Sequence, residues 1–200
     1  MWSMATKRGI GSTDLLPYDG HAVLMTGAVP CAAADRWFAV LRAEIAWRQE
    51  VARIMGRTVP IPRLTAWHGE AGYVYSGIRL EPRPWTPILL ELKAIAEGLA
   101  GQPFNSVLLN LYRDGRDSVS WHADDEPGLG PEPVIASLSL GAARRFLLRH
   151  RHTRARVAVV LGHGSCLVMS GAIQHHWQHQ VPKTARPVGP RINLTFRRMR

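Results

Sequence analysis

Two stretches of the chain carry apolar residues at the spacing of an amphipathic helix. From Ala32 to Val51, just after Pro30, apolar side chains recur at mixed three- and four-residue intervals. Similar spacing recurs from Pro87 to Leu99, with a proline in the first turn and Gly101 just past the end. We therefore expect two helices that pack against a core as supports.

After residue 103 the pattern changes to short apolar runs separated by glycine and proline turns. The predicted strands are Phe104 to Tyr112, Val119 to His122, Val134 to Leu140, Arg145 to Arg149, Arg156 to Leu161, Ser165 to Met169, His175 to Val181 and Arg191 to Arg197. Upstream, Pro60 to Pro84 is rich in proline, glycine and aromatic residues, which can lie on short strands or a hairpin. This pattern predicts a mostly β fold with flanking helices, whose core is a double-stranded β-helix, or jelly roll.

The last predicted strand alternates polar and apolar residues, so its polar side chains share one face and the others meet the core. The polar face carries Arg191, Asn193, Thr195 and Arg197. Two inward arginines are costly unless an anion meets them. Their Cα atoms are about 20 Å apart in a strand, so the guanidinium groups can bracket a small dicarboxylate.

A second apolar strand carries two polar side chains on one face. Asn110 and Tyr112 lie two residues apart there and can add hydrogen bonds to the same anionic ligand. For either strand taken alone, a solvent-facing edge strand explains the polar residues equally well.

His122 and Asp124 are two residues apart at the end of a predicted strand, where both side chains can reach one metal ion. Non-haem Fe(II) oxygenases use two histidines and one carboxylate on one octahedral face. The third ligand then comes from His175, His176 or His179, whereas His150 and His163 are expected at turns or on the surface. Taken alone, His-x-Asp also fits polar residues at a strand end, and the same ligands suit hydrolytic zinc.

Composition indicates one compact unit with a polyanionic partner. A chain of 200 residues with 46% hydrophobic content can bury one core. Its formal net charge of +10 favours a polyanionic partner such as nucleic acid. The charge by itself is equally consistent with a basic protein that has no such partner. Two distant cysteines indicate a reducing compartment, and no signal peptide or membrane span is evident, so a cytoplasmic location is expected.

The candidate residues stand in a longer series of ordered blocks, which are Pro62 to Trp67, Tyr73 to Ser76, Asn105 to Tyr112, Trp121 to Glu126, Ile135 to Gly141, His163 to Ser165, Trp177 to His179 and Arg191 to Arg197. In this order the blocks resemble the AlkB family of Fe(II)- and 2-oxoglutarate-dependent dioxygenases. The resemblance covers roughly Pro62 to Arg198, so residues 1–60 are expected as an N-terminal extension whose helix packs on the core. Residues 61–200 are then expected to form the dioxygenase domain.

This resemblance implies that Fe(II), 2-oxoglutarate and dioxygen remove alkyl groups from bases such as 1-methyladenine and 3-methylcytosine, releasing formaldehyde. His122, Asp124 and His179 are then the iron ligands, because the family places its third ligand twelve and eighteen residues before two cosubstrate arginines. The implied 2-oxoglutarate contacts are Asn110, Tyr112, Arg191, Asn193 and Arg197.

The resemblance further places Asp125 at the substrate base, and cationic methylated bases would be attracted by a carboxylate and by aromatic faces. The aromatic candidates are Trp67, Tyr73 and Tyr75, which ordinary core packing explains as well. The basic run Arg149 to Arg156 is either a phosphate contact or a solvated loop.

The expected partner is alkylated DNA, most readily single-stranded, or RNA, bound by a monomer. The alternatives are a 2-oxoglutarate oxygenase acting on a protein, lipid or small molecule, and a non-catalytic nucleic-acid-binding module with a degenerate site.

Overall fold

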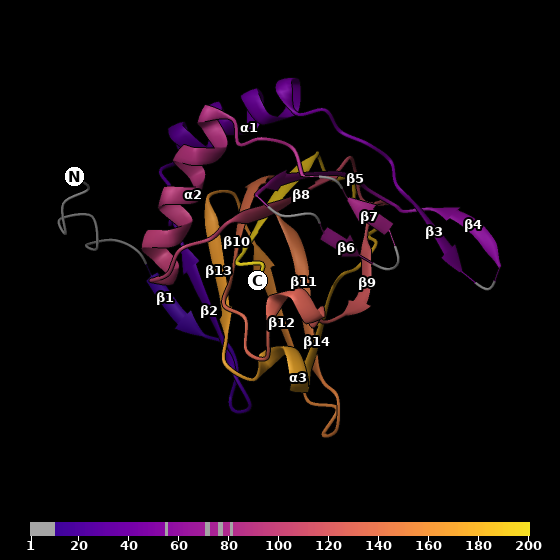
Figure 1. The fold of residues 1–200 in the computed structure, drawn as a ribbon. Helices are drawn as coiled ribbons and strands as arrows, with labels where there is room; N and C mark the ends of the chain where they lie inside the picture. Colours follow the sequence, from indigo (N-terminus) through magenta and orange to yellow (C-terminus); the bar gives the residue numbers. More distant parts are fainter. Residues whose placement is uncertain (1–10, 55, 71–72, 76–77, 81) are drawn as a thin grey trace.

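Two antiparallel sheets form the body of the molecule in the computed structural model, which describes residues 11–54, 56–70, 73–75, 78–80 and 82–200 (Figure 1). The larger sheet has the order β1 (Gly11–Asp14), β2 (His21–Thr26), β13 (Ser165–Ser170), β10 (Ile135–Gly141), β15 (Arg191–Arg197), β8 (Ser106–Tyr112) and β5 (Leu64–Gly69). The smaller sheet has the order β12 (Arg156–Leu161), β11 (Arg144–His150), β14 (Trp177–Val181) and β9 (Val119–His122). This arrangement confirms the predicted jelly roll.

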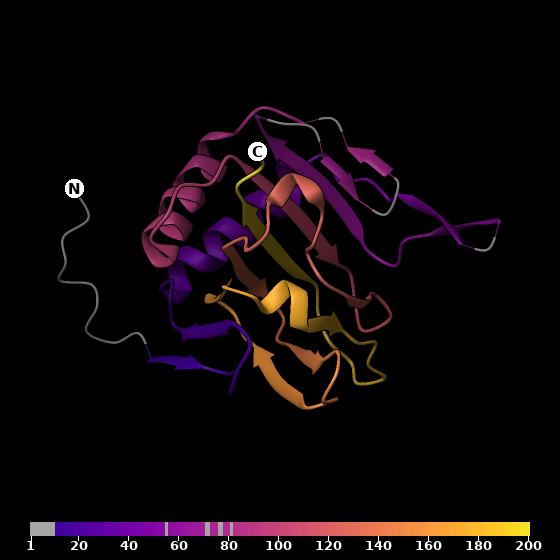
Figure 2. The ribbon, with the colours of Figure 1, turned by 60° about the horizontal axis from the view of Figure 1, so that its bottom comes forward.

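The remaining elements are two hairpins and short helical segments. The hairpins are β3 (Val51–Ile54) with β4 (Arg57–Pro60), and β6 (Tyr73–Tyr75) with β7 (Ile78–Leu80). The helices are α1 (Cys31–Glu44), α2 (Pro87–Ala100) and α3 (Ile173–His176), and a 3₁₀ turn spans Pro127–Leu129. The β3–β4 hairpin projects away from the body in both views (Figure 1, Figure 2). Within the described residues, none of the helices has the length and apolar character needed to cross a membrane.

The alternation of β15 divides the core into two layers. Ile192, Leu194 and Phe196 pack with buried residues of α1 and α2, which cover the outer face of the larger sheet. A second cluster, including Phe146 and Leu148, fills the space between the sheets. The polar residues of β15 therefore point between the two sheets, as the alternation predicts.

The helix ends follow local chemistry in one case and tertiary packing in the other. Thr86 caps α2, since its hydroxyl accepts a hydrogen bond from the Leu89 N–H at 3.4 Å, and Gly101 ends the helix in the left-handed region at φ 73°. The helix predicted to run to Val51 is shorter, because α1 ends at Glu44 and Ile45 is extended and buried. The backbone then bridges from Arg48 to Thr65, which fixes the chain beside β5.

Two further segments differ from the sequence predictions. The strand expected from His175 begins only at Trp177, because residues 173–176 form α3. Strands β1 and β2 were not predicted, and β2 pairs with β13 at the edge of the larger sheet. The first sixty residues thus contribute strands as well as a helix.

Candidate metal centre and cosubstrate pocket

Pairing of two strands brings the candidate metal ligands together. His122, the last residue of β9, lies directly opposite His179 of β14, and their ring centroids are 4.3 Å apart. Asp124 follows in the loop after β9, with its Oδ1 3.8 Å from His122 Nε2. One ligand atom from each residue lies within 4.8 Å of the other two. The set of two histidines and one carboxylate fits an Fe(II) ion.

A buried glutamine fixes the backbone of Asp124. The Gln174 side chain is 1% exposed, and its Oε1 accepts a hydrogen bond of 2.9 Å from the Asp124 N–H. Gln174 belongs to α3, which leads directly into β14 and therefore into His179. The loop carrying Asp124 is thus tied to the segment that carries the third candidate ligand.

The charges around these three residues leave them ready to bind a cation. Burial raises the pKa of the Asp124 carboxyl, but the charge of the Arg197 guanidinium and its hydrogen bond outweigh that effect, and the pKa is about 2. The Arg197 Nη2 lies 2.9 Å from Asp124 Oδ1. Burial lowers the pKa of His179 to about 3, so its imidazole is neutral and retains a lone pair for a metal.

The other two histidine candidates lie elsewhere. His175 is exposed on α3, and His176 is half-buried beside His150. Neither residue belongs to the cluster around Asp124. The geometry therefore supports the choice of His179, which the resemblance had singled out.

Next to the candidate metal ligands lies a cavity between the two sheets, which contains a buried arginine with spare hydrogen-bonding capacity. Arg191 is 1% exposed, and its Nη2 donates to Ser139 Oγ at 2.9 Å. Its guanidinium Cζ lies 5.2 Å from the centre of the Tyr112 ring. Its Nε and Nη1 have no hydrogen-bond partner among the described residues. Buried N–H groups of a cation cost free energy when they lack hydrogen-bond partners. Arg191 therefore fits an anionic ligand such as one carboxylate of 2-oxoglutarate.

Asn110 and Asn193 differ in how far the protein already satisfies them. The Asn193 Nδ2 donates to Ser137 Oγ at 2.8 Å and to the Leu138 carbonyl at 3.1 Å. Its Oδ1 accepts from the Thr195 hydroxyl at 3.0 Å. Asn110 also borders the cavity, and its Oδ1 accepts from Arg63 Nε at 2.7 Å. Of the two amides, Asn110 keeps more capacity for a ligand.

Four of these residues had no role predicted from the sequence. They are Arg63, Ser137, Ser139 and Gln174. Arg63 stands in the first block of the resemblance and both serines stand in a later one, which was the available signal. Gln174 carried no such signal, because it reaches the site only through the unpredicted turn of α3.

Of the four residues predicted to contact the substrate, Trp67 and Asp125 differ in their burial and in their contacts. Trp67 of β5 is 2% exposed and packs in a small cluster with Leu108, and Leu108 in turn borders the cavity. Asp125 is exposed, and its Oδ2 lies 3.1 Å from Arg151 Nη2. Tyr73 and Tyr75 lie on β6 as expected for a strand, but their side chains lie outside the described residues.

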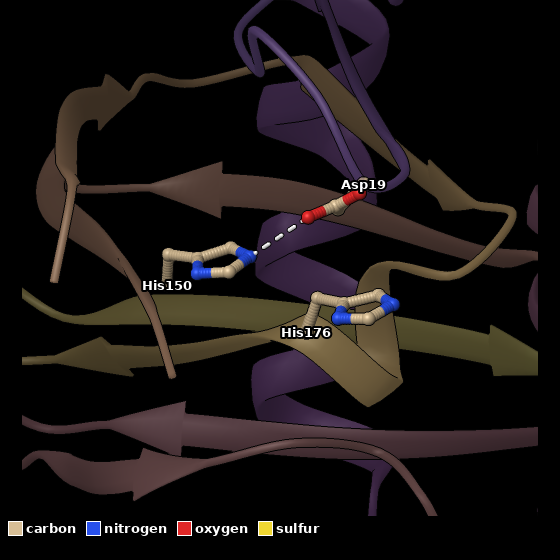
Figure 3. A group of neighbouring side chains, drawn as sticks. All are labelled: Asp19, His150 and His176. Carbon is tan, nitrogen blue, oxygen red and sulfur yellow. Dashed lines mark hydrogen bonds and ion pairs between the residues drawn. The ribbon is translucent and has the colours of Figure 1, made fainter. Parts of the chain in front are cut away.

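A second cluster of possible metal ligands joins Asp19, His150 and His176 (Figure 3). His150 was predicted at a turn or on the surface, but it is the last residue of strand β11 and is 2% exposed, because it lies beneath the β1–β2 turn. Its Nδ1 accepts backbone N–H groups of His152 and Thr153 at 3.3 and 3.1 Å, so its proton lies on Nε2 and is donated to Asp19 at 3.0 Å. Both ring nitrogens are therefore used, and the cluster is a structural junction.

Comparison with known proteins agrees with this geometry. A model of the 2OG-Fe(II) oxygenase superfamily matches residues 21–197. The alpha-ketoglutarate-dependent dioxygenase alkB homolog 3 of Bos taurus is 45% identical over 96% of this chain and 71% of the relative. The DNA oxidative demethylase ALKBH2 of Homo sapiens is 41% identical over 84% of this chain and 69% of the relative. The chain belongs to the AlkB family.

As an AlkB-family oxygenase, the protein uses Fe(II), 2-oxoglutarate and dioxygen, which the cluster around Asp124 and the cavity at Arg191 fit. A solved structure described as that of OsALKBH1 has a TM-score of 0.64 at 15% identity, covering 94% of this chain and 100% of that one. At that identity it supports the jelly-roll fold alone.

Proposed function

We propose that this AlkB-family dioxygenase oxidatively demethylates N-alkylated bases, such as 1-methyladenine and 3-methylcytosine, in nucleic acid. The observation that carries the proposal is the site itself, where a candidate Fe(II) triad adjoins a buried arginine with unpaired N–H groups. The names of the relatives support the substrate class, since they include a DNA oxidative demethylase.

The proposed residue roles follow from the contacts. His122, Asp124 and His179 would hold Fe(II), and Arg191 would bind one carboxylate of 2-oxoglutarate with help from Tyr112. Arg197, which also borders the cavity, would remain a 2-oxoglutarate contact and would keep Asp124 ionised and oriented at the metal end. Asn193 would brace β10 against β15. When bound, iron and 2-oxoglutarate supply the oxidation of the alkyl carbon by dioxygen, with release of succinate, carbon dioxide and formaldehyde.

Asp125 is the proposed contact for a cationic base. It is adjacent in sequence to the candidate ligand Asp124, but its side chain is 55% exposed and is paired with Arg151, itself 35% exposed. An exposed ion pair of this kind contributes only about 0–1 kcal/mol. A positively charged methylated base could therefore replace Arg151 as the partner of Asp125 at little cost in free energy. A neutral base would not be attracted to Asp125 in the same way.

The basic run beside the site is the proposed phosphate contact. It spans the end of β11, the exposed turn around Arg154 and the start of β12 at Arg156. Arg151 in this turn reaches Asp125, so the turn lies at the same side of the site as the proposed base contact. We propose a single-stranded nucleic acid, DNA or RNA, bound by a monomer.

The test is turnover on short oligonucleotides that carry one 1-methyladenine or 3-methylcytosine. The expected result is about one formaldehyde and one succinate per base repaired. Asp125→Ala should lose demethylation while retaining decarboxylation of 2-oxoglutarate in the absence of substrate, because its partner is the base. Consumption of 2-oxoglutarate without repair of single-stranded DNA, duplex DNA or RNA would instead favour an oxygenase of protein, lipid or small molecules.

A further inference from the structure

Arg63 is a buried arginine at the edge of the cosubstrate cavity, just before β5. It is 5% exposed and borders the same cavity as His122 and Asp124. Its backbone is fixed, because its N–H donates to the Ile61 carbonyl at 2.8 Å and the Ser118 N–H donates to the Pro62 carbonyl at 2.9 Å. The side chain therefore starts from a rigid position.

From that position Arg63 reaches the amide of Asn110 on the neighbouring strand. Its Nε donates to Asn110 Oδ1 at 2.7 Å. Strands β5 and β8 are paired with Thr65 opposite Asn110, so Arg63 approaches from two residues beyond that pair. The short distance and the burial of both side chains make this a well-defined, charge-assisted hydrogen bond.

This contact determines which end of the Asn110 amide meets the cavity. A guanidinium group only donates hydrogen bonds, so the amide atom that faces Arg63 must be the oxygen. The amide nitrogen then points away from Arg63. Asn110 Nδ2 makes no hydrogen bond within the described residues. It is also not one of the solvent-inaccessible polar atoms that lack a partner, so its surface is accessible. The N–H₂ group is thus exposed to the cavity that Asn110 borders.

We infer that Arg63 is a positioning residue that holds the Asn110 amide with its N–H₂ group toward bound 2-oxoglutarate. The inference rests on the proposed function, because Asn110 is there a cosubstrate contact. Without Arg63 the amide can rotate and present its oxygen to an anionic carboxylate, which replaces an attractive contact by a repulsive one. Arg63 would thereby strengthen cosubstrate binding through Asn110.

The test is a double-mutant cycle read out as 2-oxoglutarate affinity by anaerobic calorimetry on Mn(II)-loaded protein. Arg63→Met removes the donors but keeps an unbranched apolar stem, and Asn110→Ala removes the amide. We expect each single variant to weaken 2-oxoglutarate binding about tenfold, and the double variant to bind no worse than Asn110→Ala alone. Affinity for Mn(II) should stay unchanged, since neither residue is a candidate metal ligand.

Controls separate positioning from a general structural role. Arg116→Met removes an arginine whose side chain is 90% exposed and should leave 2-oxoglutarate affinity unchanged. Arg63→Lys keeps a cationic donor and should restore much of the affinity. If Arg63→Met does not fold, Arg63→Leu takes its place, because it also removes every donor. Melting temperatures of all variants show whether a loss of affinity merely follows a loss of stability.

Three outcomes would overturn the inference, and they differ from failure of the proposed function. If Arg63→Met binds 2-oxoglutarate with native affinity, Arg63 has no role in binding it. If Arg63→Met lowers the affinity equally in the native protein and in the Asn110→Ala variant, Arg63 does not act through Asn110. Native affinity in Asn110→Ala removes the contact that Arg63 is inferred to position, while Arg191 can still bind the cosubstrate. If the unmodified Mn(II)-loaded protein does not bind 2-oxoglutarate, the proposed function itself fails.

Discussion

A histidine can bind a metal only through a nitrogen that is free of both proton and hydrogen-bond donor, and this condition excludes His150. His179 is buried with its pKa lowered to about 3, and it lies opposite His122 on paired strands. His150 is equally buried but has both nitrogens occupied by the backbone and by Asp19. Burial and residue type alone therefore do not identify a ligand: a free nitrogen is needed, and so is a position beside the other two ligands.

We predict that His179→Ala lowers the affinity for Fe(II) or Co(II) by about a hundredfold or more, since a ligand should matter at least as much as the outer partners that tune it. His175→Ala is the matched control, because His175 is four residues away and exposed on α3. Metal stoichiometry and circular dichroism of both variants provide the measurement. Loss of metal from the His175 variant with retention in the His179 variant would reverse the assignment.

Arg191 is the proposed partner of one carboxylate of 2-oxoglutarate. Replacement by alanine should cost about 2–5 kcal/mol of 2-oxoglutarate binding, because a buried carboxylate would lose its cationic partner. Lysine should recover only part of that loss, since it lacks the planar fork of the guanidinium. Titration with 2-oxoglutarate and a redox-inert metal gives the comparison, and native affinity in the alanine variant would exclude Arg191 as the carboxylate partner.

Residues could be placed from the sequence where alternation along a strand determines which face of the sheet their side chains lie on. Arg191 and Arg197 were placed on an inward polar face because β15 alternates, and the structure puts both beside the cavity. Arg63 and Gln174 could not be placed this way. Their hydrogen bonds join residues 47 and 50 positions apart, so their roles depend on which distant segments the fold brings side by side.

Among the elements, α2 was predicted well from its apolar spacing, the proline in its first turn and Gly101 past its end, whereas the end of α1 depended on tertiary packing. Thr86 and Gly101 fix both ends of α2. The apolar pattern after α1 continues through Ile45, but Ile45 is extended and packs in the core without being helical. The short strand β1 has no buried residue, so it gave no periodic signal and was not predicted.

Thr86→Ala should destabilise the protein by about 0.5–1 kcal/mol, because Leu89 loses its side-chain acceptor at the first turn of α2. Thr86→Ser keeps the hydroxyl and should lie close to the unmodified protein. Urea unfolding followed by circular dichroism measures both. If the hydroxyl does not stabilise the helix, the alanine and serine variants should unfold at the same urea concentration.

At the scale of the whole molecule, the N-terminal segment is integrated into the fold. Strand β2 pairs with β13, and the turn after β1 places Tyr18 against Thr153, with their hydroxyls 2.8 Å apart. The indole N–H of Trp177 donates to the Tyr18 carbonyl at 3.2 Å. The segment that resembled the family least thus supports the basic turn beside the site, which only the assembled structure reveals.

The net charge of +10 leads to the last prediction, which concerns salt. Each phosphate that a basic side chain neutralises on a single strand contributes a slope of about −0.7 to the logarithm of affinity against the logarithm of salt concentration. If Arg151, Arg154 and Arg156 each meet one phosphate, a fourfold rise in salt should weaken oligonucleotide binding about twentyfold. Decarboxylation of 2-oxoglutarate without nucleic acid should not follow that slope, since the phosphate contacts are absent from it.

Arg154→Ala should reduce the salt slope by about 0.7, because one phosphate contact is lost from the exposed turn. Arg36→Ala is the matched control, since Arg36 lies on α1, over the outer face of the larger sheet, with its side chain 65% exposed. Both variants lose one positive charge, so a general effect of net charge would change both slopes equally. Binding of a methylated oligonucleotide to Mn(II)-loaded protein, measured by fluorescence anisotropy between low and moderate salt, separates the two. Equal slopes for the Arg154 and Arg36 variants would mean that the β11–β12 turn does not bind the strand, and that the basic charge of this protein acts only at long range.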